Sequence, residues 1–443
     1  MSDWKETPFA KLLVDSKDGE WGKGEEAVGL REAIVIRGTD FANLDDPAAE
    51  FPKRWIKNHL AEKKRLQPGD ILLETAGGTS TQSTGRSALI KESFFRQHGD
   101  LPVLCASFSR HLRLDTENYS PRFIYYLLQT LHRHGYMAVY NIQHTGVSRF
   151  QYTAFKNHTV LSVPDLPIQQ KIAAILSVYD ELIESNKRCI AVLERMAEEI
   201  YREWFIRLRF PGHEKVRIAK GLPQKWELVK LEDAFKFTGG GTPSKEVGRY
   251  WNGGDVNWFT PSDITGADGI FLERSGEQCT EEGYDDSSAK LFPAYSVMLT
   301  SRATIGAVGI NLTPACTNQG FITCIPNERY PLPYLYHWIK LAKPHFEILA
   351  GGATFAELRK GIFKRIEILT PPEPVVAEFA RLESPLFNAI ENHLRANWNL
   401  IETRDKLLPR LISGKLSVEN LDIQFPPSMA EEMNTEQPSI VHA

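Results

Sequence analysis

Residues 167–204 carry apolar side chains in alternating steps of four and three, and this stretch most constrains the fold. Every position of the series except Asn186 is apolar or aromatic. A period of about 3.5 residues is that of a coiled coil. A helix of about 38 residues, rising about 1.5 Å per residue, is about 57 Å long and needs a partner helix. The series comprises Ile168, Ile172, Ile175, Tyr179, Leu182, Asn186, Cys189, Leu193, Met196 and Ile200.

The same pattern returns from Pro374 onward, so the partner helix lies in the same chain. Asn186 aligns with His393, and an antiparallel pair would bring these two polar residues together at its centre. Such a contact would fix the register of the helices at some cost in stability; an incidental polar position on a wet seam is an equally good interpretation. The second series comprises Val375, Phe379, Leu382, Leu386, Ala389, His393, Ala396, Leu400, Thr403 and Leu407.

Pro385 departs from the helical pattern of the second copy. A proline inside a helix removes one backbone hydrogen bond and clashes with the preceding turn. We therefore expect a kink there, or a new helix that begins with Ser384 as its N-cap.

The segments between the helices also repeat, which predicts a mixed α/β (α+β) protein with two similar domains related by a pseudo-two-fold repeat. Asp263 aligns with Asp40, and Pro333 aligns with Pro121, at the start of a short helix in each copy. The polar, acidic end of the chain is expected to be disordered. The expected divisions are a first domain at 1–164, a helix and linker at 165–210, a second domain at 211–372, a second helix at 373–416 and a tail at 417–443.

Composition narrows the class of protein. The 443 residues include 5 cysteines without a C-x-x-C spacing, so we expect reduced thiols and no zinc site. No long apolar run or hydrophobic leader is present, and we expect a soluble, cytoplasmic protein. The net charge of −4 does not point to nucleic acid, so any such site must be local.

The sequence carries no catalytic signature in a supporting context. The loop AGGTSTQSTGRS does not fit a P-loop, because the spacing is wrong and Arg86 stands where lysine is needed. The Asn/Asp-Pro-Pro-Tyr/Phe motif of amino-methyltransferases and a nuclease core are also missing from the sequence. We therefore predict no catalytic residue and no metal ligand, and two domains that recognise rather than react.

Hydroxyl, amide and cationic side chains cluster in glycine-rich segments of both domains. An arginine such as Arg302 pairs with a guanine edge, and Asn318 or Gln319 pairs likewise with adenine. Arg302 in an ion pair is an equally good interpretation, and Trp251 and Trp258 are expected in the core. Lys360, Lys364 and Arg365 suit phosphates, or simply a solvated face. The candidate DNA-binding residues are Thr79, Ser80, Thr81, Gln82, Arg86, Thr242, Ser244, Arg302, Thr304, Asn318, Gln319, Lys360, Lys364 and Arg365.

The chain resembles the specificity subunit of Type I restriction–modification systems over residues 1 to about 415. The resemblance rests on PIQQKIAAIL…YDELIESNKRCIAVLERMAEEIYREWF, TGGGTPS…YW, TPSDI, SRATIG, NQGF and LLPRLISGKL. The first domain matches only in its general plan, as expected where specificity varies.

The resemblance implies a non-catalytic subunit whose two target recognition domains each read half of a split, asymmetric site in double-stranded DNA. The antiparallel helices would act as a ruler and bind two methyltransferase (modification) subunits, and restriction (translocase–nuclease) subunits would join that core. It also implies that S-adenosylmethionine, ATP and Mg belong to those partners, with no cofactor in this chain.

Two other functions remain alternatives on the sequence alone. One is a self-sufficient DNA methyltransferase or nuclease, which the missing motifs oppose. The other is a coiled-coil adapter that binds only proteins; salt-dependent, sequence-selective DNA binding would distinguish it from a DNA-recognition subunit.

Overall fold

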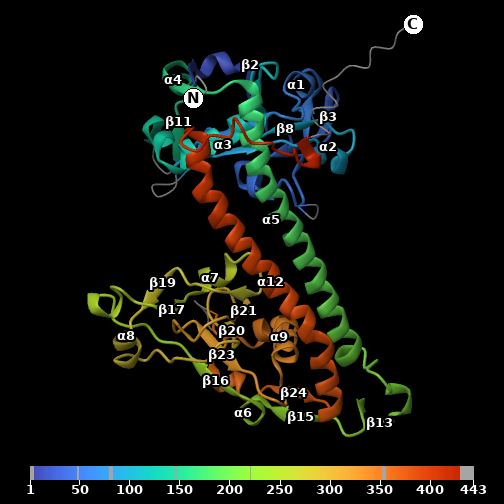
Figure 1. Cartoon of the computed structure of the whole chain (residues 1–443). Coiled ribbons are helices and arrows are strands. Elements are labelled where there is room, and N and C mark those ends of the chain that lie inside the picture. The colour runs from blue at the N-terminus through green and yellow to red at the C-terminus, as the bar shows by residue number, and fades with distance from the viewer. Residues whose placement is uncertain are drawn as a thin grey trace. The chain divides into compact units, whose positions relative to one another are not determined.

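The protein divides into two compact units that each contain part of two long helices. The computed structural model describes residues 4–46, 49–78, 83–144, 147–219, 221–351 and 356–429. The first unit comprises Met1–Glu184 with Trp398–Ala443, and the second comprises Ser185–Asn397. The long helices are α5 (Leu166–Tyr201) and α12 (Glu373–Ile412) (Figure 1). Among the helices of the described residues, none combines the length and the apolarity that a bilayer crossing requires.

The first unit is built on two main sheets, with strand orders β2-β9-β5-β7 and β4-β3-β8. A three-stranded sheet β10-β11-β6 and the antiparallel pair β1-β12 complete it. The strands are β1 (Lys5–Pro8), β2 (Leu13–Asp18), β3 (Leu30–Ile36), β4 (Lys53–Lys57), β5 (Ile71–Glu74), β6 (Ala76–Gly78), β7 (Ser87–Leu89), β8 (Val103–Cys105), β9 (Ser109–Leu114), β10 (Asn141–His144), β11 (Val147–Phe150) and β12 (Val160–Val163). The short helices are α1 (Asn58–Lys63), α2 (Glu92–His98), α3 (Pro121–Arg133) and α4 (Tyr152–His158).

The second unit repeats this plan. Its main sheets have the orders β16-β23-β20-β21-β18 and β19-β17-β22, beside the pairs β15-β24 and β13-β14. The strands are β13 (Ile218–Ala219), β14 (Leu222–Pro223), β15 (Glu227–Lys230), β16 (Lys236–Gly239), β17 (Val256–Phe259), β18 (Phe271–Leu272), β19 (Glu277–Cys279), β20 (Val297–Thr300), β21 (Val308–Asn311), β22 (Ala315–Thr317), β23 (Phe321–Ile325) and β24 (Glu367–Thr370). The short helices are α6 (Leu231–Ala234), α7 (Pro261–Thr265), α8 (Glu281–Asp285), α9 (Leu332–Leu341), α10 (Lys343–Leu349) and α11 (Lys360–Phe363).

The strand orders confirm the internal repeat predicted from the sequence. Asp40 and Asp263 occupy the same place, because each follows the central strand of its three-stranded sheet and closes a capping box. Pro121 and Pro333 both stand in the first turn of a helix, α3 and α9. A proline suits that place because the backbone N–H it lacks would have no partner within the helix.

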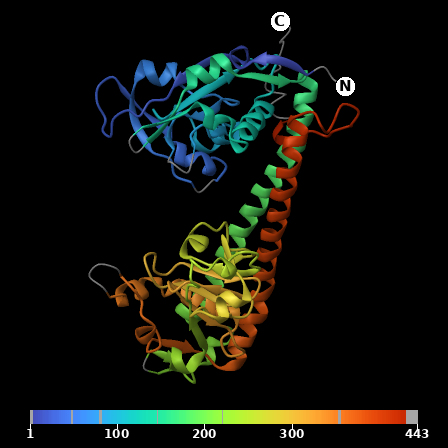
Figure 2. The same ribbon diagram turned by 90° about the vertical axis from the view of Figure 1, so that its left-hand side faces the viewer.

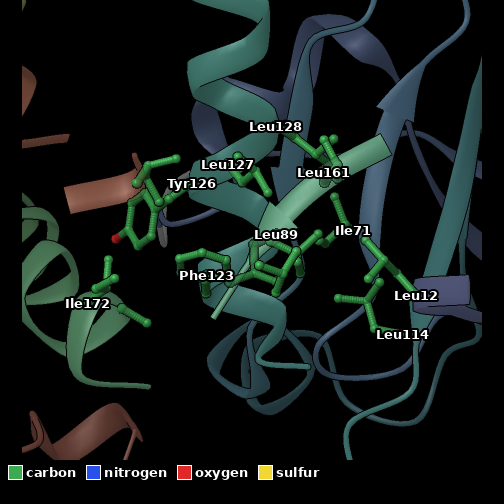
Figure 3. Close-up of a cluster of buried hydrophobic side chains, with 14 of the residues drawn as sticks. Leu12, Ile71, Leu89, Leu114, Phe123, Tyr126, Leu127, Leu128, Leu161 and Ile172 are labelled. Atoms are coloured by element: carbon green, nitrogen blue, oxygen red, sulfur yellow. The ribbon is translucent and has the colours of Figure 1, made fainter. Parts of the chain in front are cut away.

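The core of the first unit joins its sheet to both long helices. Phe9, Ile71, Leu112 and Phe123 are fully buried in one cluster with α3. The cluster continues onto Ile172 of α5 (Figure 3). On α12 it continues onto Leu408, Leu411 and Ile412. The helix segments are therefore part of the domain core and not appendages to it, and their burial is stabilised by the hydrophobic effect.

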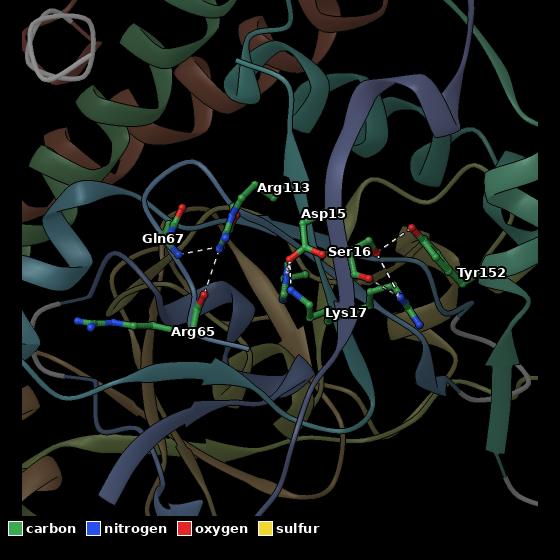
Figure 4. Close-up of polar contacts among 10 residues, drawn as sticks. Asp15, Ser16, Lys17, Arg65, Gln67, Arg113 and Tyr152 are labelled. Atoms are coloured by element: carbon green, nitrogen blue, oxygen red, sulfur yellow. Dashed lines mark hydrogen bonds and ion pairs between the residues drawn. The ribbon is translucent and has the colours of Figure 1, made fainter. Parts of the chain in front are cut away.

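Polar contacts fix the strands of the same sheet. The Tyr152 hydroxyl donates to Ser16 Oγ at 2.8 Å, which ties α4 to β2. Arg113 of β9 donates from Nη2 to the Arg65 carbonyl at 3.1 Å (Figure 4). The same nitrogen donates to Asp70 Oδ2 at 2.7 Å. Because Asp70 is 1% exposed and precedes β5, this charge-assisted pair anchors the start of that strand.

The two long helices pair antiparallel within each unit (Figure 2). In the first unit, Arg404 Nη1 donates to Asp180 Oδ1 at 2.6 Å. In the second unit, Asn186 of α5 contacts His393 of α12, and Tyr201, which is later on α5, contacts Phe379, which is earlier on α12. The two helices therefore run in opposite directions.

The coiled-coil period is correct, but three of the ten predicted seam positions on α5 are exposed. Leu182 and Met196 are 47% and 49% exposed, and Cys189 is exposed as well. The buried column lies one residue later, at Leu176, Ile183, Ile190 and Ala197. The sequence offers two neighbouring apolar columns at the same period, and the periodicity does not distinguish between them. On α12 the shift is similar, since Leu382 is 42% exposed and Glu383 is buried.

Asn186 and His393 lie in contact in the second unit. His393 Nδ1 is 2.9 Å from Asn186 Oδ1, and Asn186 Nδ2 donates to Asn397 Oδ1 at 2.8 Å. Because an amide oxygen only accepts, the imidazole must carry its proton on Nδ1. The role of these residues in fixing the register stays a prediction.

The expectation that Pro385 begins a new helix is wrong. Helix α12 is continuous from Glu373 to Ile412, and the Ser384 hydroxyl donates back to the Ala380 carbonyl at 2.6 Å instead of capping a new start. Pro385 is exposed, while Glu383 and Phe387 on either side are buried. Tertiary packing of these neighbours offsets the local cost of proline, which is about 3 kcal/mol.

The expectation of a disordered tail is wrong for residues 417–429, and 430–443 lie outside the described residues. Val418 and Met429 are 1% and 4% exposed and belong to the core of the first unit. Lys171 donates to the carbonyls of Glu419 and Leu421, each at 2.8 Å, and Arg122 donates to Ser428 Oγ at 2.9 Å. These contacts order a segment whose composition alone resembles that of a disordered chain.

Glu383 and His337 form a buried pair between α12 and α9. The Oε2 atom of Glu383 lies 3.5 Å from His337 Nε2, and Tyr201, Tyr336 and Phe387 surround the imidazole. Burial raises the pKa of Glu383 to about 8 and lowers the pKa of His337 to about 3. Both side chains are therefore uncharged at neutral pH.

We predict that the second unit loses stability between pH 6.5 and 8. Folded Glu383 keeps its proton up to about pH 8, whereas the ordinary carboxyl value is 4.5, so stability falls as pH rises between these values. Folded His337 stays neutral, whereas the unfolded chain takes up a proton on this residue below its ordinary pKa of 6.5. His337 therefore lowers stability as pH falls, and only below pH 6.5. The change in melting temperature with pH should flatten in Glu383→Gln. Glu378→Gln, on the exposed face of the same helix, should keep the wild-type slope; an equal slope in all three proteins would contradict the assignment.

Candidate nucleic-acid interface

Four segments of the second unit converge beside the end of β20. They are the end of β16 with the residues after it (239–242), the residues after β20 (301–302), the turn between β22 and β23 (318–320), and the start of α11 with the residues before it (357–360). The Ser301 N–H donates to the Gly320 carbonyl at 2.7 Å, and the Leu358 N–H donates to the Ser301 carbonyl at 2.9 Å. Thr242 Oγ1 donates to Gln319 Oε1 at 2.7 Å. The sequence-predicted residues Thr242, Arg302, Asn318, Gln319 and Lys360 thus gather on one surface.

The close approach of these segments explains the run of three glycines. A Cβ at Gly240 would lie 1.9 Å from the Asn318 carbonyl oxygen, and one at Gly241 would lie 2.4 Å from the backbone nitrogen of Ala289. Backbone atoms cannot move aside as a flexible side chain can, so a larger residue at either place would separate the strands. Lys360 Nζ lies directly over Gly239, which brings a cation to this surface.

Amide groups at the β22–β23 turn face different partners. Asn318 Oδ1 accepts the Gly320 N–H at 2.9 Å, which closes a local turn. The exposed Gln319 accepts from Thr242 on one lone pair and keeps a second lone pair and both amide hydrogens. Gln319 therefore retains the donor and acceptor that adenine recognition requires.

Arg302 is held by a carboxylate in the protein alone. Its Nε donates to Glu357 Oε1 at 2.8 Å, and its side chain stays 47% exposed. The ion pair, which was one of the two interpretations of the sequence, is therefore present. It orients the guanidinium and leaves half of the side chain exposed to solvent.

The remaining predicted residues of the second unit serve more local contacts. The Ser244 carbonyl accepts the Trp251 indole N–H at 3.0 Å, and the Thr304 carbonyl accepts the Thr300 hydroxyl. Lys364 pairs with Glu232 at 3.1 Å. Arg365 is exposed, as a phosphate contact requires. Their role in DNA binding stays a prediction.

Lys245, in the loop between β16 and β17, has a structural role and was not among the residues predicted from the sequence. Its ammonium lies 3.4 Å from the ring centre of Trp251 and 4.6 Å from that of Trp258, and it pairs with Glu277 at 2.6 Å. Trp258 is 4% exposed, which confirms its place in the core. A lysine between two tryptophan rings is attracted by both, so it holds the loop from Thr242 to Trp251 in place.

The first unit offers fewer of its predicted residues to a ligand. Thr79, Ser80, Thr81 and Gln82 lie outside the described residues. Arg86 donates to both carboxylate oxygens of Glu74, at 2.9 Å and 2.6 Å, and these hydrogen bonds raise the pKa of its guanidinium. Glu74 is only 4% exposed, so this bidentate pair ties the loop to the sheet. Arg86 as a DNA contact stays a prediction.

We predict that Arg302→Ala weakens binding about tenfold at one half-site only, because one bidentate contact to a base is worth about 1–3 kcal/mol. Fluorescence anisotropy with duplexes altered in one half at a time would measure it. Glu357→Gln should keep or raise the affinity, because it releases the guanidinium from its ion pair. Equal losses at both half-sites in Arg302→Ala would contradict a base contact.

Comparison with known proteins identifies relatives of the whole chain. A family model described as the Type I restriction modification DNA specificity domain matches residues 35–195 and 223–397. The MjaIX specificity subunit of a Type I restriction enzyme from Methanocaldococcus jannaschii is 33% identical over 213 residues, which are 48% of this chain and 47% of that relative. The alignment thus spans about half of that relative's length. The putative MjaX specificity subunit of the same organism is 24% identical over 437 residues, 94% of each chain.

A solved structure shares the fold. The S subunit of a Type I restriction-modification system from M. genitalium superposes with a TM-score of 0.57 at 16% sequence identity. The superposition covers 93% of this chain and 96% of that one. At this level of identity the likeness concerns the fold alone.

Proposed function

Because the chain belongs to the family of the Type I restriction modification DNA specificity domain, we propose that it reads a bipartite, asymmetric DNA site and brings methyltransferase subunits to it. The observation that carries the proposal is the repeat itself. The two units share the order of four strands in one main sheet and of three strands in the other, and they hold different side chains at corresponding loops. Such a chain is suited to two unlike half-sites, one for each unit.

The chemistry of the second unit supports DNA as the ligand. Its surface presents a half-exposed guanidinium, an exposed primary amide and the ammonium of Lys360 on a rigid frame. Guanidinium and amide groups distinguish base edges in the major groove, and ammonium groups bind phosphates. The net charge of −4 is compatible with this because the cations are local.

The outward apolar column of α5 is suited to protein partners. In the second unit, Cys189, Val192 and Met196 follow one another at helical spacing, and Val192 and Met196 are 45% and 49% exposed. In the first unit, Val178 and Leu182 are 40% and 47% exposed. Apolar side chains repeated along one face of a helix are a surface for another helix. We infer that each segment receives one methyltransferase subunit, and that restriction subunits join the resulting complex.

The proposed division of labour gives this chain no reaction of its own. S-adenosylmethionine, ATP and Mg would then serve the partner subunits. In the described part of the chain, no group of three or more His, Cys, Asp and Glu side chains is arranged to hold a metal ion. Methyl transfer by the purified chain alone would establish the alternative of a self-sufficient enzyme.

We predict that the chain with its methyltransferase subunits methylates one split DNA motif. Mapping methylated adenines in host DNA, with and without this chain, would reveal the motif. Binding to a duplex that carries it should weaken steeply with salt, because phosphate contacts release counterions. A methylation map unchanged by loss of the chain, together with no sequence-selective binding, would favour the protein-only adapter.

We predict that Val192→Glu with Met196→Glu prevents co-purification of methyltransferase subunits and leaves DNA binding intact. Charges on this face would have to be desolvated against a partner helix. Ala191→Glu, at an exposed position on another face of α5, is the matched control and should retain assembly. Assembly that survives the double substitution would contradict the proposed surface.

A further inference from the structure

We propose that Phe108 and Arg149 are base-contacting residues of the first unit, with Phe108 against a thymine methyl group and Arg149 at a guanine edge. The proposal rests on the proposed function and adds to it the chemistry of one half-site. Neither residue belongs to the set expected from the sequence. Both flank residues 75–76, directly after β5, which correspond to 301–302 of the second unit.

Phe108 projects from a turn whose backbone is fixed. The Phe108 carbonyl accepts the N–H groups of Thr75 at 2.8 Å and Ala76 at 3.2 Å. The turn is closed by the Ser109 N–H, which donates to the Ala106 carbonyl at 2.8 Å. Phe108 is 59% exposed although the strands on either side, β8 and β9, are largely buried. A single exposed apolar residue is ordinary, so it is the position of Phe108 that sets it apart.

The backbone hydrogen bonds show that this turn of the first unit corresponds to the turn at 318–320 of the second unit. The Ala106 N–H donates to the Ile36 carbonyl, just as the Asn318 N–H donates to the Phe259 carbonyl. The Thr75–Phe108 bond likewise corresponds to the Ser301–Gly320 bond. Phe108 therefore stands where the second unit has Gly320.

The exchange of residues changes what the turn presents. A Cβ at Gly320 would lie 3.0 Å from Asn318 Oδ1, so the asparagine covers that place in the second unit. The first unit has Ala106 in place of Asn318, which leaves room for the phenylalanine ring. The second unit thus presents amide groups at this turn, and the first presents an apolar ring.

Arg149 is placed by the same frame. The Phe150 N–H donates to the Thr75 carbonyl at 2.9 Å, as the Leu358 N–H donates to the Ser301 carbonyl at 2.9 Å. Arg149 pairs with Ala76 between β11 and β6, where the second unit has the bridge between Glu357 and Arg302. The first unit therefore has its arginine on the other strand and an alanine across from it instead of a carboxylate. Arg149 is exposed, and within the described residues no carboxylate lies in ion-pair contact with it.

These two side chains match two features of the major groove. The C5-methyl group of thymine makes apolar contacts, and a guanidinium donates to both O6 and N7 of guanine. Because Phe108 and Arg149 flank the same two backbone residues, the bases that they contact should be close together in one half-site. Neither side chain offers a hydrogen-bond acceptor, so neither would select a base amino group.

Base analogues test each residue separately. The probe is a duplex carrying the motif found by methylation mapping, with each thymine replaced in turn by deoxyuridine and each guanine by 7-deazaguanine. For the wild-type chain, one uracil and one 7-deazaguanine substitution in the same half-site should each lower affinity, the latter about tenfold. Phe108→Ala should abolish the response to that uracil, and Arg149→Ala the response to that 7-deazaguanine.

Matched controls separate this inference from the proposed function. Val28→Ala removes another exposed apolar side chain of the first unit, and Arg65→Ala removes an exposed arginine that precedes β5, at the opposite end of that strand from Thr75. Both should keep the wild-type response to every analogue. If the duplex binds but Phe108→Ala and Arg149→Ala respond to each analogue as the wild type does, the inference is overturned and the proposed function stands. If the wild-type chain does not select the motif at all, the proposed function itself fails.

Discussion

The antiparallel pairing of α5 with α12 is the interaction on which the rest of the structure depends. Each helix has a domain on one side and the other helix on another, so neither could bury its apolar face alone. In the first unit, Arg404 of α12 donates a hydrogen bond to Asp180 of α5, and both helices share a hydrophobic core with α3. In the second unit, Asn186 of α5 forms hydrogen bonds with His393 and Asn397 of α12. The rings of Tyr201 and Phe379 add an aromatic contact between the same helices.

On that common frame the two units carry unlike chemistry. The same backbone hydrogen bonds hold Gly320 in one unit and Phe108 in the other. The same strand bridge joins Arg302 to Glu357 in one and Ala76 to Arg149 in the other. A scaffold held by backbone bonds allows the side chains at its loops to change without loss of the fold. A family of DNA specificity domains requires this tolerance of different loop side chains on one fold.

Much of the architecture could be predicted from the sequence because it is periodic. The 3.5-residue period gave both helices, and the repeated prolines and aspartates aligned the two domains. The facing column of α5 was misassigned because Leu182, Cys189 and Met196 are as apolar as Leu176, Ile183 and Ile190. Only the packing of the partner helix distinguishes the two columns. Pro385 and the segment 417–429 were misjudged for a related reason, since buried neighbours override local propensity.

The candidate site was harder to predict because its contacts join distant parts of the chain. The partner of Arg302 is 55 residues away, and nothing in the local sequence marks Glu357. Lys245 lies between two tryptophans that a sequence pattern assigns only to the core. Phe108 and Arg149 become notable only when hydrogen bonds align the two units. The role of a loop residue depends on its contacts with residues that are distant in the sequence, and local sequence patterns do not reveal those contacts.

The antiparallel register of α5 and α12 can be tested by cross-linking pairs of cysteines placed on the two helices. In a Cys189→Ser background, cysteines replacing Asn186 and His393 should be joined within one chain by a short bifunctional thiol reagent, because the side chains that they replace are in contact. Cysteines replacing Asn186 and Asn392 should not, since Asn392 is exposed on another face of α12. Free thiols in the first pair, or equal cross-linking of both pairs, would contradict the antiparallel register.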